Sequence, residues 1–398
     1  MVHVFLPSSR PAIFAGISAL LAGALALTGC SSTPKKGVDT RTTTVAPTTE
    51  AVVTPPPFTS SGIPAALAAV IKPLYFGGAL SASPSAALAL RKRKPVKATG
   101  SVVVKGSVAS WKGVPIAVVT RGKDVTLAVA APRWKVVGGW WPSVGVAAPS
   151  LGGTPRRVLL VGSDARPGQA VERSRGDSLH IVGLDGHGGG GILGIARDSY
   201  VNLATGGMGK INSVLTFGGP KALQRTVVSA TGVPLEGYMI TGFFGFKGLV
   251  NGIGGLRLKA PVAVKDAMSS ANVKAGVNHL SGVQALSYAR ARHAVAGGDF
   301  GRSANQGLLI KALADFARLA GPTRLPGLLH MADPKIATNL SAEQVLTFAA
   351  GACVVPSNRI HNRVAAGSFG WTSDRQSIVL FDASARRMFA DIKDGNLS

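Results

Sequence analysis

A series of short apolar runs, each ending in a polar, glycine-containing loop, constrains the fold of this chain most strongly. The runs VLLVG, SLHIVGL and ILGIA follow one another closely after Arg157. Short runs rich in Val, Ile and Leu between turn signals are typical of buried strands. Helical periodicity then returns and alternates with strand patterns, so the sequence predicts a mixed α/β domain.

The rest of the chain predicts further individual elements. Caps at Ser281 and at Ser341 with Gln344 mark two helix starts, the second as a capping box. In chain order we expect helices at 210–217 and 220–231, a strand at 238–241, a helix at 243–251, a strand at 256–260, helices from 281 to 290 and from 303 to 319, a helix after 341, and one more strand and helix before Ser398.

The first thirty residues have the layout of an export signal. Arg10 is followed by an uncharged run from Pro11 to Thr28, and Leu27-Thr28-Gly29-Cys30 matches a lipobox. Residues 1–29 are therefore predicted to be a lipoprotein signal peptide, with Cys30 as the lipid anchor on the extracytoplasmic face of the bacterial plasma membrane. The alternative is a single uncleaved transmembrane helix, because about 18 apolar residues just span a bilayer. Both alternatives place the bulk of the chain outside the cytoplasm.

Composition predicts a tether between this signal and the folded part. Residues 31–62 are rich in Ser, Thr and Pro, and residues 63–100 are rich in Ala with a basic cluster at 91–94. We expect 30–100 to form a disordered tether, in which the basic cluster is a solvated linker rather than a contact to anionic headgroups. Short β-rich runs at 101–153 predict a small antiparallel element.

Net charge limits the partners that the chain can have, and cysteine content limits its disulfides. The formal net charge is +25, which favours polyanions. An exported protein meets anionic lipids, lipid pyrophosphates and phosphate-rich wall polymers, so we expect no nucleic acid partner. Cys30 and Cys353 are the two cysteines of the chain, so no disulfide framework is expected.

Acids and arginines gather in loops at the ends of the predicted elements. The sequence has no Walker-type loop, no His-Glu-x-x-His, no Cys-x-x-Cys and no Gly-x-Ser-x-Gly, which disfavours nucleotide and hydrolase functions. Polar loops of this kind instead occupy 162–166, 175–178 and 196–199.

The densest cluster combines three arginines with one acid and the amide of Gln306. It runs from Tyr288 to Gln306 and contains Arg290, Arg292 and Arg302. Arginine bonds phosphate oxygens bidentately and keeps its charge, so the cluster can clamp a pyrophosphate. The alternative is a solvated basic face, or structural ion pairs with Asp177 and Asp299.

These segments together resemble the LytR-CpsA-Psr family, over about Arg157–Leu319. The matching segments, in order, are VLLVGSDARPG, RSRGDSLHIVGL, ILGIARDSYV, GKINSVLTFGGP, FFGFKGLVNGIGGL and YARARHAVAGGDFGRSANQ. The resemblance implies a catalytic domain at 154–325 built on a central, largely antiparallel sheet flanked by helices, with 326–398 as a C-terminal α/β extension packed on it.

The resemblance also implies the site. Asp164, Arg197, Arg290 and Arg292 would be catalytic, and Asp177 and Asp299 would hold Mg²⁺ or Mn²⁺. Pyrophosphate would be bound by Arg197, Lys210, Asn212, Arg290, Arg292, Arg302 and Gln306. Whether Asp164 is a general base or another metal ligand stays open. The family's Arg-Ser-Asp-Thr stretch reads Arg175-Gly176-Asp177-Ser178 here, which leaves the acid but changes its neighbours.

The activity implied is transfer of a glycopolymer from a polyprenyl-pyrophosphate carrier onto peptidoglycan. The lipid tail would lie in an apolar groove formed by segments such as 243–249 and 308–316, which ordinary core packing explains equally well. One alternative is a non-catalytic envelope lipoprotein that binds polyprenyl phosphates or anionic polymer. Regulation of transcription is a further alternative, which the export signal and the lack of a helix-turn-helix pattern disfavour.

Overall fold

A computed structural model describes residues 57–96 and 101–397 of the chain. The predicted signal peptide, Cys30 and the first part of the tether lie outside the described residues and stay predictions. Within the described ranges, none of the helices combines the length and the hydropathy that spanning a bilayer requires.

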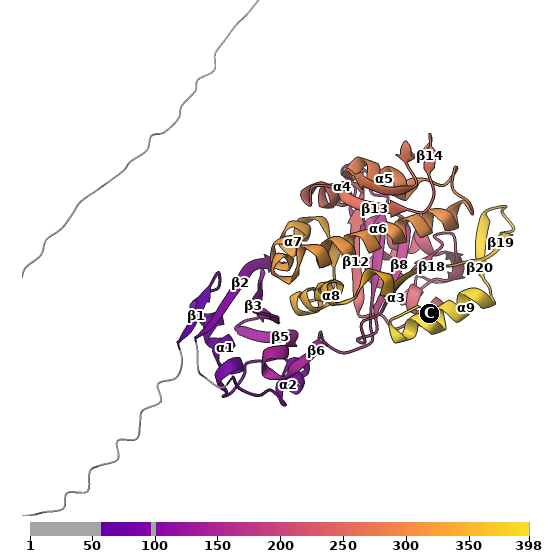
Figure 1. The fold of residues 1–398 in the computed structure, drawn as a ribbon. Helices are drawn as coiled ribbons and strands as arrows, with labels where there is room; N and C mark the ends of the chain where they lie inside the picture. The colour runs from indigo at the N-terminus through magenta and orange to yellow at the C-terminus, as the bar shows by residue number, and fades with distance from the viewer. Residues whose placement is uncertain (1–56, 97–100, 398) are drawn as a thin grey trace, which may run out of the picture. The chain divides into compact units, whose positions relative to one another are not determined.

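A six-stranded sheet forms the N-terminal part, drawn in indigo and purple in Figure 1. Its strands lie in chain order: β1 (Phe58–Ser61), β2 (Val102–Trp111), β3 (Val114–Arg121), β4 (Asp124–Ala130), β5 (Trp134–Trp141) and β6 (Val146–Ser150). β1 pairs with β2 in parallel, and the other neighbours pair antiparallel. Helices α1 (Ala65–Phe76) and α2 (Pro84–Leu90) share a hydrophobic cluster with one face of this sheet.

The predicted tether is wrong for residues 57–96, because this segment is folded. α1 buries Leu67, Ile71 and Leu74, which recur at helical spacing along one face. α2 begins after Ser83, whose hydroxyl accepts the backbone N–H of Ala86. The high alanine content that suggested a linker here supplies small, helix-forming residues.

A second six-stranded sheet forms the centre of the remaining chain, in the order β17-β12-β7-β8-β9-β18. Its strands are β7 (Arg156–Ser163), β8 (Gly176–Leu184), β9 (Gly190–Ile195), β12 (Gly237–Gly242), β17 (Ala337–Thr338) and β18 (Ile360–Ala365). β17 with β12, β7 with β8 and β8 with β9 are antiparallel, whereas β12 with β7 and β9 with β18 are parallel. The expected largely antiparallel sheet is confirmed.

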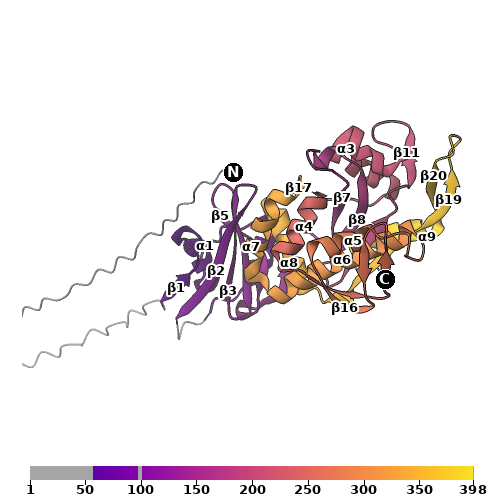
Figure 2. The ribbon, with the colours of Figure 1, turned by 90° about the horizontal axis from the view of Figure 1, so that it is seen from above.

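Helices cover both faces of the central sheet (Figure 2). Leu159 and Val161 of β7 share a cluster with α3 (Val214–Thr231) and α9 (Ala383–Asp391). Val158 and Leu160 alternate with them and pack instead with α8 (Ala342–Val354), while α6 (Asp299–Ala320) covers β8 and β9. The period-two alternation along β7 thus produces the predicted helix–sheet–helix layering.

Shorter elements complete the chain. The helices are α4 (Phe243–Gly252), α5 (Gly282–Arg290) and α7 (Leu325–Ala332). Two-stranded pairs are formed by β10 (Tyr200–Asn202) with β11 (Met208–Lys210), β13 (Leu256–Ala260) with β16 (Gly276–Leu280), β14 (Val264–Asp266) with β15 (Ala271–Val273), and β19 (Gly367–Trp371) with β20 (Ser377–Phe381). Single 3₁₀ turns lie at 142–144, 171–173, 211–213, 322–324, 333–335, 357–359 and 392–394.

The predicted boundary at residue 325 is wrong. β17 and β18, both beyond it, are the two edge strands of the central sheet, so 326–398 completes the domain rather than packing on it. A single hydrophobic cluster also joins the two six-stranded sheets. It contains Trp111 and Ile116 from the N-terminal sheet, Leu325 from α7 and Leu346 from α8.

Candidate functional site

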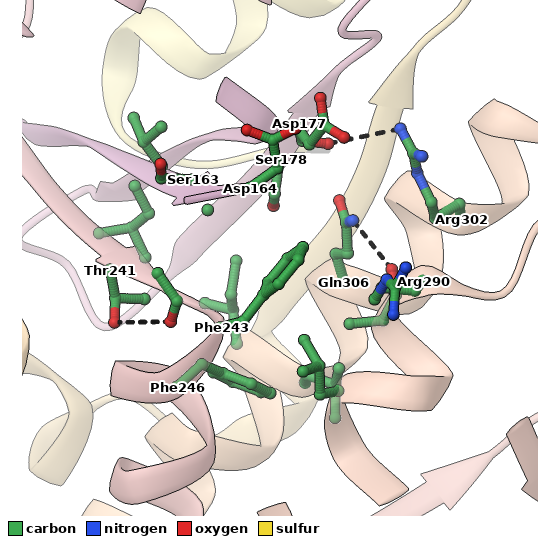
Figure 3. Close-up of a pocket in the computed structure, with 18 of the residues that line it drawn as sticks. Ser163, Asp164, Asp177, Ser178, Thr241, Phe243, Phe246, Arg290, Arg302 and Gln306 are labelled. Atoms are coloured by element: carbon green, nitrogen blue, oxygen red, sulfur yellow. Dashed lines mark hydrogen bonds between the residues drawn. The ribbon is translucent and has the colours of Figure 1, made fainter. Parts of the chain in front are cut away.

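A cavity of about 490 Å³ lies between the central sheet and the helices α4, α5 and α6. One part of its lining is polar and the other is apolar. The polar part brings together residues predicted from distant segments of the sequence: Asp164, Asp177, Arg197, Arg290, Arg292, Arg302 and Gln306. Figure 3 shows Asp164, Asp177, Arg290, Arg302 and Gln306 around the same space.

Arg197 is the centre of an ionic network at the polar end. It follows β9, and its Nη1 lies 2.6 Å from Oδ2 of Asp177 at the start of β8. Its Nε lies 3.7 Å from Oδ1 of Asp299 and 3.8 Å from Oδ2 of Asp198. Burial disfavours the charged guanidinium, but the three carboxylates together raise the pKa of Arg197. Arg197 is therefore a fixed cation at the wall of the cavity.

Arg302 adds a second buried cation on the first turn of α6. Its Nη2 lies 2.7 Å from Oδ1 of Asp299 and donates to the carbonyl oxygen of Asp177 at 3.4 Å. Burial lowers the pKa of Arg302, although the negative charge of Asp299 opposes this shift. Burial also raises the pKa of Asp299, although the charges of Arg302 and Arg197 oppose that shift. Asp299 also lies in the first helical turn, where the helix dipole favours a carboxylate.

Arg290 and Arg292 differ from these two, because neither forms an ion pair within the part of the chain that the structure describes. Arg290 ends α5, and its guanidinium carbon lies 5.2 Å from the centre of the Phe243 ring. The backbone N–H groups of Arg292 and His293 both donate to Oδ2 of Asp266, at 2.9 and 3.0 Å. The loop that carries Arg292 is thus held in place while the side chain stays exposed.

Two other predicted residues position the polar wall. Oδ1 of Asp164 accepts the backbone N–H of Arg175 at 2.9 Å, which ties the end of β7 to the loop before β8. Gln306 on α6 donates through Nε2 to the carbonyl oxygen of Ala289 at 3.0 Å and thereby braces the last turn of α5.

Lys210, Asn212 and Asp299 do not line the cavity. Lys210 forms an ion pair with Asp198 at 3.4 Å. Asn212 is buried, and its backbone N–H donates to the carbonyl oxygen of Arg197 at 3.2 Å. In this structure Asp299 pairs with Arg197 directly, Asn212 holds the backbone of Arg197, and Lys210 pairs with Asp198 beside it.

Sequence reasoning missed the contact between Ser178 and His180 on β8. His180 is fully buried, with Nε2 at 3.0 Å from the carbonyl oxygen of Ser303 and Nδ1 at 3.2 Å from Oγ of Ser178, which lines the cavity. Because a carbonyl only accepts, Nε2 carries the proton and Nδ1 accepts the hydroxyl of Ser178. A lone histidine in an apolar strand gave no signal of this contact. Asp198 belongs to the ionic network but was not predicted as a site residue. It lies in the polar loop at 196–199, and the position of that loop after a strand was the signal that could have identified it.

The apolar part of the cavity comes from the two segments proposed for a lipid groove. α4 contributes Phe243, Phe246 and Leu249, and α6 contributes Leu309, Ile310 and Leu313. Figure 3 places Phe246 on the side of the space opposite Asp177, with the ring of Phe243 between them. The cavity therefore combines apolar surface with cations, and Arg290 lies where the two meet, beside Phe243.

A metal ion fits the polar end only through a small number of protein ligands. Among the described residues, no group of three or more His, Cys, Asp or Glu side chains is placed to hold an ion. Oδ1 of Asp177, however, is buried without a hydrogen-bond partner in that part of the chain. Mg²⁺ commonly takes one or two carboxylates and completes its shell with water and phosphate oxygens, so the residues present fit that ion.

Comparison with known proteins gives a consistent picture. The model of the LytR_cpsA_psr family matches residues 146–391. The chain is 34% identical over 175 residues to the probable cell wall biosynthesis protein LcpB of Corynebacterium glutamicum, covering 41% of this chain and 42% of that protein. It is 32% identical over 198 residues to the polyisoprenyl-teichoic acid–peptidoglycan teichoic acid transferase TagV of Bacillus subtilis, covering 47% and 50%. The chain thus spans about half the length of these curated relatives.

Solved structures share the fold. The crystal structure of B. subtilis TagV superimposes with a TM-score of 0.51 at 28% identity, covering 60% of this chain and 97% of that chain. A structure of TagT bound to LI-WTA superimposes with a TM-score of 0.50 at 20% identity, covering 61% and 90%. The second likeness concerns the fold alone.

Proposed function

Because the chain belongs to the LytR-CpsA-Psr family, we propose that it transfers a phosphate-linked glycopolymer from a polyprenyl-pyrophosphate carrier onto peptidoglycan. One observation carries the proposal: a cavity with an apolar lining also presents two arginines, Arg290 and Arg292, that form no ion pair among the described residues. A donor with an isoprenoid tail and a pyrophosphate has the same two-part chemistry. The TagV relative of B. subtilis is a polyisoprenyl-teichoic acid–peptidoglycan teichoic acid transferase, which supports the same reaction class.

The apolar lining would hold the lipid tail. Phe246 and Leu249 face the space from α4, and Leu313 faces it from α6. Burying isoprenoid surface there contributes roughly 25 cal/mol per Å², which favours a long tail over a short one.

The pyrophosphate would lie against Arg290 and Arg292. A guanidinium binds phosphate oxygens bidentately and keeps its charge. Within the part of the chain that the structure describes, neither arginine would first have to release a paired carboxylate. Arg197 and Arg302 are already paired, so they would act as a fixed positive wall with Asp177 and Asp299 holding them in place. Such preorganised charge stabilises the charge that develops in phosphoryl transfer.

In the reaction, the oxygen of a peptidoglycan sugar hydroxyl forms a bond to the sugar-side phosphorus. The bond between that phosphorus and the bridging oxygen breaks, and polyprenyl phosphate leaves with the electron pair. The hydroxyl proton passes to a base. Asp164 would take it, because it lines the cavity and forms no ion pair with an arginine side chain among the described residues. The arginine wall aligns the reacting groups.

Mg²⁺, or Mn²⁺ in its place, would be held by Asp177, with Asp299 as the second carboxylate. The buried, unbonded Oδ1 of Asp177 supports this assignment. When bound, the ion would neutralise charge on the phosphate oxygens.

We further propose that the protein works on the extracytoplasmic face of the plasma membrane. The lipobox ending at Cys30 supports a lipid anchor, and the apolar run before it is compatible with a transmembrane helix instead. Either anchor would keep the cavity near its membrane-embedded donor. Fractionation tests the first: Cys30→Ala should leave the protein unprocessed or released from the membrane.

The transfer itself is tested with the purified full chain, Mg²⁺, a synthetic polyprenyl-pyrophosphate saccharide and peptidoglycan oligomers. The native chain should form linked product, and Arg290→Ala should lower the rate on the order of a hundredfold. Arg257→Ala removes an exposed arginine on β13, outside the cavity, and should have no effect. Tight donor binding without product from the native chain would instead establish a non-catalytic binding role.

A further inference from the structure

Two large aromatic side chains are exposed on the β19–β20 hairpin near the end of the chain. The side chains of Phe369 and Trp371 are 67% and 72% exposed. They lie two residues apart in a regularly paired strand, so both project from the same face of the hairpin. The hairpin extends at the right of Figure 1, above α9.

The hairpin is attached directly to the ionic network of the site. The backbone N–H of Val379 on β20 donates to the carbonyl oxygen of Asp198 at 3.0 Å. The ring of Phe369 lies 5.3 Å from that of Phe300, centre to centre, and Phe300 follows Asp299 in the first turn of α6. The hairpin is therefore attached, through one backbone hydrogen bond and one ring contact, to the segments that carry Asp198 and Asp299.

This connection identifies the side of the site on which the hairpin lies. Arg197 and Arg302 line the cavity, whereas Asp198 and Asp299 do not. The hairpin therefore adjoins the ionic network on the side away from the apolar lining. In phosphoryl transfer the attacking and leaving oxygens lie roughly in line, so an acceptor approaches from the side opposite the lipid-linked leaving group.

We propose that Phe369 and Trp371 bind the sugar rings of the acceptor glycan strand of peptidoglycan. This inference rests on the proposed transferase function and names the acceptor part of its site. Sugar rings present apolar C–H faces that stack on aromatic rings. Residues i and i+2 of a strand are about 6.7 Å apart, which lets each ring contact its own sugar in an extended strand.

The surface suits a glycan better than a protein or a membrane. A stable protein interface buries about 800 Å² on each partner, which exceeds what two rings on a two-stranded ribbon provide. The turn of the hairpin carries one acid and one base, Asp374 and Arg375, so it lacks the positive charge that attracts anionic headgroups.

Binding is measured by calorimetry with the full chain and two probes: peptidoglycan glycan strands freed of their stem peptides, and vesicles of phosphatidylglycerol. Trp371→Ala should weaken glycan binding roughly five- to tenfold, and Trp371→Phe should retain most of it. Phe217→Ala is the matched control, because Phe217 is 78% exposed on α3, outside the hairpin. Thermal unfolding of each variant confirms that it is folded.

Equal glycan affinity in the native chain and in Trp371→Ala overturns the proposal, as does Trp371-dependent binding to vesicles but not to glycan. Because no donor is present, binding is separable from turnover. A native chain that binds glycan through Trp371 but transfers nothing supports the glycan site and contradicts the transferase function.

Discussion

His180 and Ser303 join β8 to α6 through one buried hydrogen bond of 3.0 Å, between imidazole Nε2 and a backbone carbonyl. Burial lowers the pKa of His180 to about 4, from an ordinary value near 6.5. The unfolded chain therefore binds a proton at pH values where the folded chain does not. Stability from this residue is complete above pH 6.5 and falls as the pH drops from about 6.5 to about 4, by about 3 kcal/mol.

Urea unfolding of the native chain and of His180→Gln between pH 7 and pH 4 measures this effect. Glutamine keeps a donor near Ser303 but does not titrate. The variant should show a shallower loss of unfolding free energy over this interval. Identical pH dependence in the two proteins would rule out His180 as a source of acid sensitivity.

Asp177→Asn tests the metal assignment without relying on activity. The substitution keeps the side-chain shape but removes the charge, so we expect Mg²⁺ to bind at least about tenfold more weakly. Competition against Mn²⁺, followed by electron paramagnetic resonance, gives the affinity. Glu343→Gln is the control, because it removes an acid on α8 that pairs with Lys135, away from the cavity. Unchanged affinity in Asp177→Asn would exclude this carboxylate as a ligand.

Leu313→Trp tests the apolar end of the cavity. Leu313 lines the space, so a larger side chain should occupy volume that the lipid tail would fill. We expect the Kd for a long-chain polyprenyl phosphate to rise about tenfold, with a smaller change for a short-chain analogue. Leu319→Trp on the same helix is the control, because Leu319 is 69% exposed. Equal effects of both substitutions would argue against a lipid site here.

Gly162→Ala tests how closely β7 and β8 approach beside the site. Gly162 lies opposite Ser178 in the register, and an added Cβ would meet the Cβ of Ser178 at 2.8 Å. We expect a loss of about 1–3 kcal/mol in the free energy of unfolding. At Gly153 an added Cβ meets nothing within 4 Å, so Gly153→Ala should cause no such loss. A Gly162→Ala protein as stable as the native chain would show that the strands separate easily.

Local signals predicted local structure well. The strand at Leu256–Ala260 was expected with the bounds observed, and the cap at Ser281 and the capping box at Ser341 are both present. Such signals lie within a few residues of each other, so the sequence displays them directly. α6 instead begins at Asp299 rather than Ser303, because the Gly297-Gly298 turn permits an earlier start and a carboxylate in the first turn stabilises it.

Pairing between distant strands was not predictable in the same way. β18 pairs with β9 although Ile360 is far from its partner Gly190 in the sequence. No local pattern marks Ile360 as the start of an edge strand. The site shows the same difference between what local sequence predicts and what only the fold reveals. Arginines and acids could be recognised by type, but only the folded chain separates the paired Arg197 and Arg302 from the unpaired Arg290 and Arg292.

The hydrophobic cluster shared by the two sheets determines where the chain can be divided. The cluster buries Trp111 and Ile116 together with Leu325 and Leu346, and each fully buried side chain of this kind contributes about 1.5–3 kcal/mol. Dividing the chain between β6 and β7 would therefore expose apolar surface on both fragments, and such surface favours aggregation. A fragment that begins at β7 is therefore expected to be less soluble than the full chain, because the apolar side chains that α7 and α8 contribute to this cluster would be exposed.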